Sequence, residues 1–252
     1  MDRLRLWQTV KDKNNIKPEL QEYRKKWKEL HPDYDHILTD DADNRKLVSK
    51  YFPEYLTFYD GLTFNIERVD FVRFVMMWIG GVYADMDTYP LKNIDAFVNT
   101  SKIVFGCEPQ EHAQTIYNKE KVICNALMIS PPKQNFWKKI MKFIVNNYEY
   151  NFKPVETTGP IAITKFYENF PDEWSDVIIT DPCIFYPMKS DNTISDRCKK
   201  GESYVVHVWD NSWVPKAWYK DPIVWNKRYW AGGVCVIIML LIILYIYMNK
   251  MR

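Results

Sequence analysis

The chain has 252 residues, a formal net charge of +2 and a hydrophobic content of 47%. A chain of this size and composition can bury a substantial core, as one large domain or two small ones. Its basic residues form no single block and are nearly balanced by acidic ones, which argues against a surface for nucleic acid.

The predicted elements alternate between strands and helices. An alternating pattern predicts a first strand over 3–9, and Pro18, followed by apolar residues at helical spacing, predicts a helix to residue 30. A strand over 34–39 and a helix over 42–51, capped by Asp40 or Asp41, come next. Further helices are expected at 65–79, 134–149 and 160–169, and further strands at 81–85, 102–106, 121–129, 176–180 and 203–208. This order predicts an α/β fold with a mostly parallel sheet flanked by helices.

An uncharged apolar run occupies residues 230–248 near the C-terminus. A helix over this run is about 28 Å long, close to the thickness of the hydrocarbon core of a bilayer. Tryptophan and tyrosine lie at its two edges, with basic residues on both flanks, as in membrane-spanning helices. We therefore expect one C-terminal transmembrane helix, joined to the rest of the chain by a connector over 209–229.

The cysteines and the N-terminus bear on location. Five cysteines are widely spread and form no Cys-x-x-Cys pair, which favours reduced thiols. The first 15 residues are polar and charged, so we expect no signal peptide. With a membrane helix made last, the soluble part is expected on the cytosolic side, and the lumen of an endomembrane is the alternative.

Two charged residues lie on the predicted helix over 65–79, which is otherwise rich in apolar residues. Asp70 and Arg73 are three positions apart and therefore point the same way. Buried charges are costly unless they pair or contact a ligand. Both interpretations, a structural ion pair and a ligand contact, remain open at this point.

Two carboxylates follow the next predicted strand. Gly80 and Gly81 end the helix, and the short strand that follows ends at Asp85 and Asp87. Residues i and i+2 of an extended chain project to the same side, and ligands of open α/β sheets bind at the carboxyl ends of strands. Neighbouring carboxylates repel unless a cation lies between them, and hard oxygen ligands suit Mg²⁺ or Mn²⁺. The pattern predicts a divalent metal site.

The order Asp-x-x-Arg, then Gly-Gly-x-Tyr-x-Asp-x-Asp, resembles glycosyltransferase family 32, the DXD-containing sugar transferases that include fungal mannosyltransferases. The glucosylating domains of clostridial toxins are similar over the same stretch. The resemblance implies a GT-A-like fold, a UDP- or GDP-linked sugar donor, Mn²⁺ or Mg²⁺, and transfer with retention. It also implies that Asp70, Arg73 and Asp85 contact the donor, that Asp87 ligates the metal with Asp85, and that Tyr83 lies beside them.

Other fragments resemble the same family. Gln8 and Thr9 match its opening strand, but Trp7 and Val10 depart from it, which puts a base-stacking role there in doubt. Asn125 and the helix start at Thr158-Gly159-Pro160 match further segments. His207, Ser212 and Trp213 resemble the closing segment, which implies a metal-ligating histidine and contacts from Ser212 and Trp213 to the diphosphate. His31, His36 and His112 lack such neighbours, and we expect no site role for them.

These observations predict a catalytic domain over 1–208 that moves a hexose or N-acetylhexosamine to a glycan or glycolipid acceptor at a membrane. A membrane-anchored binding or adaptor protein with an inactive transferase fold is the main alternative. A metal-dependent phosphohydrolase is a weaker one, because the chain shows no second cluster of carboxylates and histidines.

Overall fold

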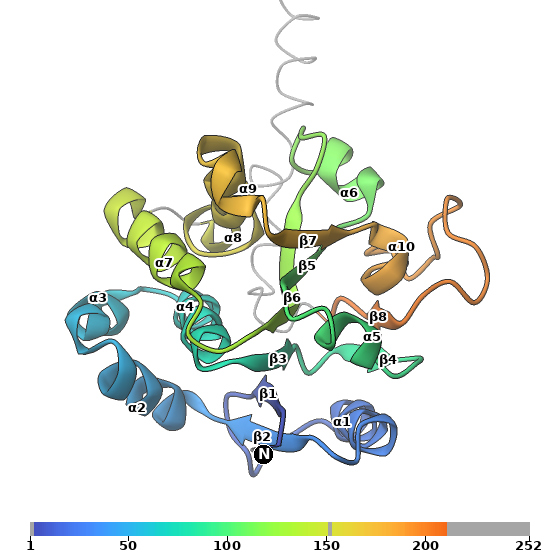
Figure 1. Ribbon diagram of the computed structural model, residues 1–252, viewed down its shortest axis with the longest axis horizontal. Coiled ribbons are helices and arrows are strands. Elements are labelled where there is room, and N and C mark those ends of the chain that lie inside the picture. The colour runs from blue at the N-terminus through green and yellow to red at the C-terminus, as the bar shows by residue number, and fades with distance from the viewer. Residues whose placement is uncertain (1–2, 151–152, 211–252) are drawn as a thin grey trace, which may run out of the picture. The chain divides into compact units, whose positions relative to one another are not determined.

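A six-stranded mixed sheet forms the centre of the fold in the computed structural model, which describes residues 3–150 and 153–210 (Figure 1). Its strand order is β2-β1-β3-β6-β5-β7. The strands are β1 (Arg5–Thr9), β2 (Asp35–Thr39), β3 (Gly81–Ala84), β5 (Ile103–Cys107), β6 (Ile123–Ser130) and β7 (Val177–Thr180). Only β6 runs antiparallel to its neighbours β3 and β5, while the other three pairings are parallel. The prediction of a mostly parallel sheet is confirmed.

Helices cover both faces of this sheet. They are α1 (Pro18–Leu30), α2 (Asp41–Tyr51), α3 (Leu56–Gly61), α4 (Asn65–Ile79), α5 (Asp95–Val98), α6 (Gln110–Thr115), α7 (Asn135–Asn147), α8 (Pro154–Thr157), α9 (Pro160–Asn169) and α10 (Pro182–Phe185), with 3₁₀ turns η1 (Pro53–Tyr55) and η2 (Pro171–Trp174). Successive strand residues alternate between two cores: Trp7 and Tyr83 pack with α4 and α7, and Leu6 and Val82 pack with Trp27 of α1.

The longer elements begin and end close to where local sequence signals place them. Proline occupies the first turn of α1 and of α9, where a missing amide hydrogen costs nothing. The Asp40 side chain accepts a hydrogen bond from the backbone amide of Asp43 (3.0 Å) and so caps α2. The predicted helix over 65–79 coincides with α4.

A second, two-stranded sheet brings distant parts of the chain together. Strand β4 (Thr88–Pro90) pairs antiparallel with β8 (Val205–His207), and Thr88 lies opposite His207. The strand over 203–208 was predicted, but its partner directly after the Asp-x-Asp sequence was not. The pairing sets the histidine beside the carboxylates.

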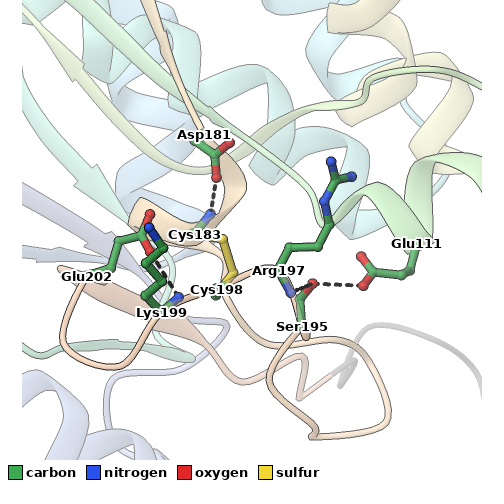
Figure 2. The surroundings of a disulfide bond; sticks show 8 residues. All are labelled: Glu111, Asp181, Cys183, Ser195, Arg197, Cys198, Lys199 and Glu202. Atoms are coloured by element: carbon green, nitrogen blue, oxygen red, sulfur yellow. Dashed lines mark hydrogen bonds between the residues drawn. A yellow bond between two sulfur atoms is a disulfide. The ribbon is translucent and has the colours of Figure 1, made fainter.

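A disulfide corrects one prediction. Cys183 and Cys198 are bonded to each other, whereas reduced thiols were expected (Figure 2). Spacing along the chain did not reveal this pair, because the loop that brings the two residues together has no regular pattern. The same loop is tied to α6 by Ser195, whose hydroxyl donates to the Glu111 carboxylate (2.7 Å). Cys107 and Cys124 are free and buried.

The described residues end at Asp210. Across residues 3–150 and 153–210, no helix is long and apolar enough to cross a membrane. The predicted connector beyond Asp210 and the predicted transmembrane helix over 230–248 lie outside the described residues, as do Ser212 and Trp213.

Candidate active site

Two glycines set the start of the strand that carries the carboxylates. Gly80 and Gly81 have φ angles of 103° and 116°, a region that residues with a side chain rarely adopt. A Cβ atom at Gly81 would lie 2.3 Å from the backbone oxygen of Arg5, so β3 approaches β1 this closely only without a side chain there. The chain then runs straight through β3 to Asp85 at the carboxyl end of the sheet.

Arg73 lies at the centre of a buried group of polar side chains. Its Nη1 donates to Asp70 Oδ1 (3.0 Å), its Nη2 lies 2.8 Å from Asp85 Oδ1, and its Nε donates to the Tyr83 hydroxyl (2.9 Å). The Tyr83 hydroxyl in turn donates to Asp85 Oδ1 (2.5 Å). Of the two interpretations left open by the sequence, the ion pair of Asp70 and Arg73 is present, and Arg73 also neighbours Asp85 of the Asp-x-Asp sequence, while a ligand contact stays a prediction.

Asp70 is held by three elements. Besides Arg73, it accepts hydrogen bonds from Asn125 Nδ2 on β6 (2.8 Å) and from the Thr158 hydroxyl ahead of α9 (3.0 Å). A Cβ on Gly159 would lie 3.2 Å from Asp70 Oδ2, so the small residue leaves room for this contact. The predicted site residues Asp70 and Asn125 therefore lie together, and Thr158 joins them through its side chain.

Asp85, Asp87 and His207 form a cluster that could hold a metal ion. One potential ligand atom from each lies within 4.8 Å of the others. Asp85 and Asp87 each keep 18% of their side-chain surface exposed, so an ion could reach them. Two carboxylates and an imidazole are donors that Mn²⁺ accepts, and Mg²⁺ suits the carboxylates. The residues present fit the divalent ion that the sequence predicted.

Residues 207–210, at the end of β8 and directly after it, form a closing segment that contacts Asp87. His207 Nε2 lies 3.2 Å from Asp87 Oδ1, and the backbone amide of Asp210 donates to Asp87 Oδ2 (2.9 Å). The backbone amide of Val208 donates to the Asp87 carbonyl (2.9 Å). Both carboxylate oxygens of Asp87 are thereby engaged by the closing segment.

A hollow of about 200 Å³ borders Asp87. Its lining comes from α1, from the closing segment and from the loop over 186–204, which the disulfide ties to α10 and which we call the disulfide loop. The lining residues besides Asp87 are Glu19, Leu20, Tyr23, Asn192, Val208, Trp209 and Asp210. This volume is below the roughly 300 to 1,000 Å³ of typical small-molecule sites.

Burial and neighbouring charges shift the pKa values of the site residues in opposite directions. Burial raises the pKa of Asp70 to about 6, against the effect of Arg73, and it also raises the pKa of Asp85. Burial would raise the pKa of Asp87 as well, but His207 and the Asp210 amide outweigh it and bring the value down to about 2. Burial would lower the pKa of His207, but Asp87 outweighs it and the pKa is raised. Both shifts favour the charged forms of Asp87 and His207, so these two residues favour an ion pair when no metal is bound.

Several contacts that the sequence did not predict also build the site. Thr158 contacts Asp70, and Asp210 contacts Asp87 through its backbone amide. His112, expected to have no site role, is buried and its ring packs against Trp209 beside His207 (centroids 4.8 Å apart). A local motif could not reveal these contacts, because each joins segments far apart in the sequence.

The opening strand explains one departure from the family pattern. Trp7 is 5% exposed, packs in the core and donates its indole N–H to the Gly80 carbonyl (3.0 Å). It therefore holds the Gly-Gly turn, and a base-stacking role does not fit it. The neighbouring Gln8 is buried, and within the described residues both polar atoms of its side chain lack a hydrogen-bond partner.

A mixed α/β sheet with an Asp-x-Asp pair, a histidine and an arginine at its carboxyl edge defines a DXD-type glycosyltransferase architecture. Residues 17–104 match the family model described as "Glycosyltransferase sugar-binding region containing DXD motif". The resemblance to these sugar transferases is confirmed, and the chain is related to enzymes of the glycosyltransferase class.

The similar proteins of known name include fungal mannosyltransferases. Inositol phosphoceramide mannosyltransferase 2 of Schizosaccharomyces pombe is 25% identical over 217 residues, which cover 82% of this chain and 58% of that protein. Mannosyl phosphorylinositol ceramide synthase SUR1 of Saccharomyces cerevisiae is 27% identical over 59% of this chain and 37% of its own length. The chain thus spans little more than half of the first relative and less of the second.

The fold also matches a solved structure. Mouse xyloside xylosyltransferase 1 superposes with a TM-score of 0.52 at 12% identity, over 85% of this chain and 100% of that one. At this identity the match concerns the fold alone. It agrees with the GT-A-like sheet that the sequence predicted.

Proposed function

We propose that this protein is a metal-dependent, retaining glycosyltransferase that moves a hexose or N-acetylhexosamine from a nucleotide-sugar to a glycan or glycolipid acceptor. The observation that carries the proposal is the cluster of Asp85, Asp87 and His207, with ligand atoms within 4.8 Å of one another. Arg73, 2.8 Å from Asp85, adds a fixed positive charge beside it.

The proposed chemistry follows from these charges. Breaking the bond between the sugar and the diphosphate leaves negative charge on the diphosphate. A divalent ion held by Asp85, Asp87 and His207 would supply Lewis-acid stabilisation of that charge. Arg73 is preorganised by Asp70 and Tyr83, so it needs no rearrangement to stabilise an anionic group. Asp70 and Asn125 are proposed to contact the donor, and the buried Thr158 hydroxyl orients Asp70.

The names of the relatives favour mannose as the sugar and an inositol-phosphate ceramide lipid as the acceptor. Both relatives described above are named for mannosyl transfer to such a lipid. We extend this to the present chain as a proposal, with a GDP-linked donor before a UDP-linked one. Ser212 and Trp213 are proposed to contact the diphosphate.

Donor hydrolysis tests the proposal most directly. The full chain, purified in detergent, is incubated with Mn²⁺ and either GDP-mannose or UDP-linked hexoses and N-acetylhexosamines, and release of free sugar is followed. We expect slow hydrolysis of one donor that stops when a chelator is added. If no donor is hydrolysed or bound, the inactive transferase fold is favoured instead. The departure of Trp7 and Val10 from the family pattern is the sequence feature that supports this alternative.

We further propose that the chain associates with a membrane through a helix over 230–248, with residues 209–229 as connector. Of the two orientations, the lumen of an endomembrane is favoured by the Cys183–Cys198 disulfide, because disulfides persist in oxidising compartments and are rare in the cytosol. The sequence-based expectation of a cytosolic orientation depended partly on reduced thiols, and the disulfide removes that support.

A further inference from the structure

The backbone of Trp209 adopts a conformation that a bulky residue rarely takes. Its φ angle is 57°, in the left-handed region, where a residue with a large side chain is uncommon. Such strain persists only where surrounding contacts enforce it, and it gathers at functional sites. Trp209 lies between His207 and Asp210, the two residues that engage the carboxylate of Asp87.

The left-handed conformation of Trp209 lets the residues directly before and after it both contact Asp87. Val208, before the turn, donates its amide hydrogen to the carbonyl of Asp87 (2.9 Å), and Asp210, after it, donates to Asp87 Oδ2 (2.9 Å). An extended residue 209 would send the following amide away from Asp87. The conformation of residue 209 therefore determines whether the closing segment can contact both the backbone carbonyl and the carboxylate of Asp87.

The indole ring is fixed on several sides. It lies against the His207 ring (centroids 4.1 Å apart, planes at 45°) and against His112 (4.8 Å, 70°). Its N–H donates to the Met188 carbonyl in the disulfide loop (2.7 Å). His112 is itself held, because its Nε2 accepts a hydrogen bond from the Ser190 amide (2.8 Å). The ring is thus held between the proposed metal ligand, α6 and the loop of residues 186–204.

We infer that Trp209 is a positioning residue that fixes the His207 imidazole and the Asp210 amide around Asp87 and thereby sets the affinity of the site for a divalent cation. The inference rests on the proposed metal site, and it adds a residue that acts through its neighbours. Loss of groups that orient metal ligands typically weakens metal binding about 10- to 100-fold.

The test compares Trp209→Leu, Trp209→Phe and Trp174→Leu with the unchanged chain. Trp174 is a core tryptophan, more deeply buried than the half-buried Trp209, and packs against Phe105, Phe136 and other aromatic rings, so it controls for loss of an indole ring alone. Mn²⁺ affinity is measured by electron paramagnetic resonance of free Mn²⁺ on the full chain in detergent, and thermal unfolding is followed on the same samples.

We expect Trp209→Leu to raise the Kd for Mn²⁺ about 10-fold or more. Trp209→Phe, which keeps a ring against His207, should stay within about threefold, and Trp174→Leu within about twofold despite a lower Tm.

A metal-free measurement separates the inference from the proposed function. In the unchanged chain, the ring current of Trp209 should shift the carbon-bound imidazole protons of His207 and His112, two of the four histidines, and Trp209→Leu should remove these shifts while Trp174→Leu keeps them. If the unchanged chain binds Mn²⁺ and Trp209→Leu binds it equally well, the inference is wrong and the metal site stands. If the unchanged chain binds no Mn²⁺, the metal site and the inference both fail.

Discussion

Asp87 receives its contacts from residues 207–210, near the end of the described chain, and each contact involves its carboxylate or its carbonyl. Asp87→Asn removes one negative charge from the proposed metal site and keeps the shape of the side chain. Since metal stabilisation of the leaving group contributes several kcal/mol, we expect sugar transfer to fall at least about 100-fold. Product formation measured at saturating donor and Mn²⁺ checks this.

The control for Asp87→Asn is Asp176→Asn, which makes the same change on a carboxylate that is 92% exposed and lies beside β7. It should leave transfer and Mn²⁺ dependence unchanged. Full activity of Asp87→Asn with unaltered metal dependence would overturn the assignment of Asp87.

Arg73 pairs with two carboxylates in the structure and is also proposed to contact the donor, and the two roles predict different losses. Its removal leaves the carboxylates of Asp70 and Asp85 buried without their cation, which typically costs about 3–5 kcal/mol of folding stability. We therefore expect Arg73→Ala to lower the Tm strongly, which differential scanning calorimetry measures. Donor affinity, determined well below the Tm, should fall as well, because a charge-assisted contact to an anion contributes about 1.5–3 kcal/mol. An unchanged donor affinity would leave Arg73 with the structural role alone.

The raised pKa of His207 predicts how metal binding depends on pH. The imidazole pairs with Asp87 when protonated and must lose that proton to ligate a metal. Because its pKa lies above the usual 6.5, Mn²⁺ affinity should rise with pH through and beyond that value, by about tenfold per pH unit below the pKa. Titrations at several pH values measure this, and affinity independent of pH over the same range would exclude His207 as a ligand.

The same pair affects stability of the metal-free protein in a defined direction. His207 has a raised pKa when folded, so its contribution is fully present below its unfolded value and is lost as pH rises through the folded value. Asp87 has a lowered pKa of about 2, so its contribution is present above its unfolded value and is lost as pH falls toward 2. The pair therefore stabilises the fold most in weakly acidic solution.

At the scale of elements, the disulfide restrains the irregular loop that lines the hollow beside Asp87. Its cysteines are 15 positions apart, and a cross-link of that length contributes about 3 kcal/mol by restricting the unfolded chain. We expect the double variant Cys183→Ser/Cys198→Ser to lose about this much stability, as measured by urea unfolding. Reductant should lower the stability of the unchanged chain by a similar amount and leave the double variant unaffected. Equal stability of both proteins without reductant would contradict this.

The elements that could be predicted from sequence are those whose signals are local. The helix at 65–79, the Gly80-Gly81 break and the strand before Asp85 follow from periodicity and from backbone conformations that favour glycine. These elements also align Asp70, Arg73 and Asp85 as expected. The β4–β8 pairing, the disulfide and the contact of His112 with Trp209 could not be predicted, because each depends on how distant segments fold onto one another.

At the scale of the whole molecule, the disulfide makes the compartment testable. With a tag on the N-terminus and intact vesicles treated with protease, we expect the tag to be protected until detergent is added, since an oxidising lumen preserves the disulfide. Digestion of the tag without detergent would show that the domain lies on the cytosolic side.

The pairing of Thr88 with His207 also determines when the site can form as the chain is made. Asp87 leaves the ribosome about 120 residues before His207, which at roughly 5–20 residues per second is an interval of about 6–24 s. During that time the two carboxylates exist without the histidine. A nascent or truncated product that stops short of residue 207 therefore lacks one of the three groups of the cluster, so incomplete chains cannot assemble it.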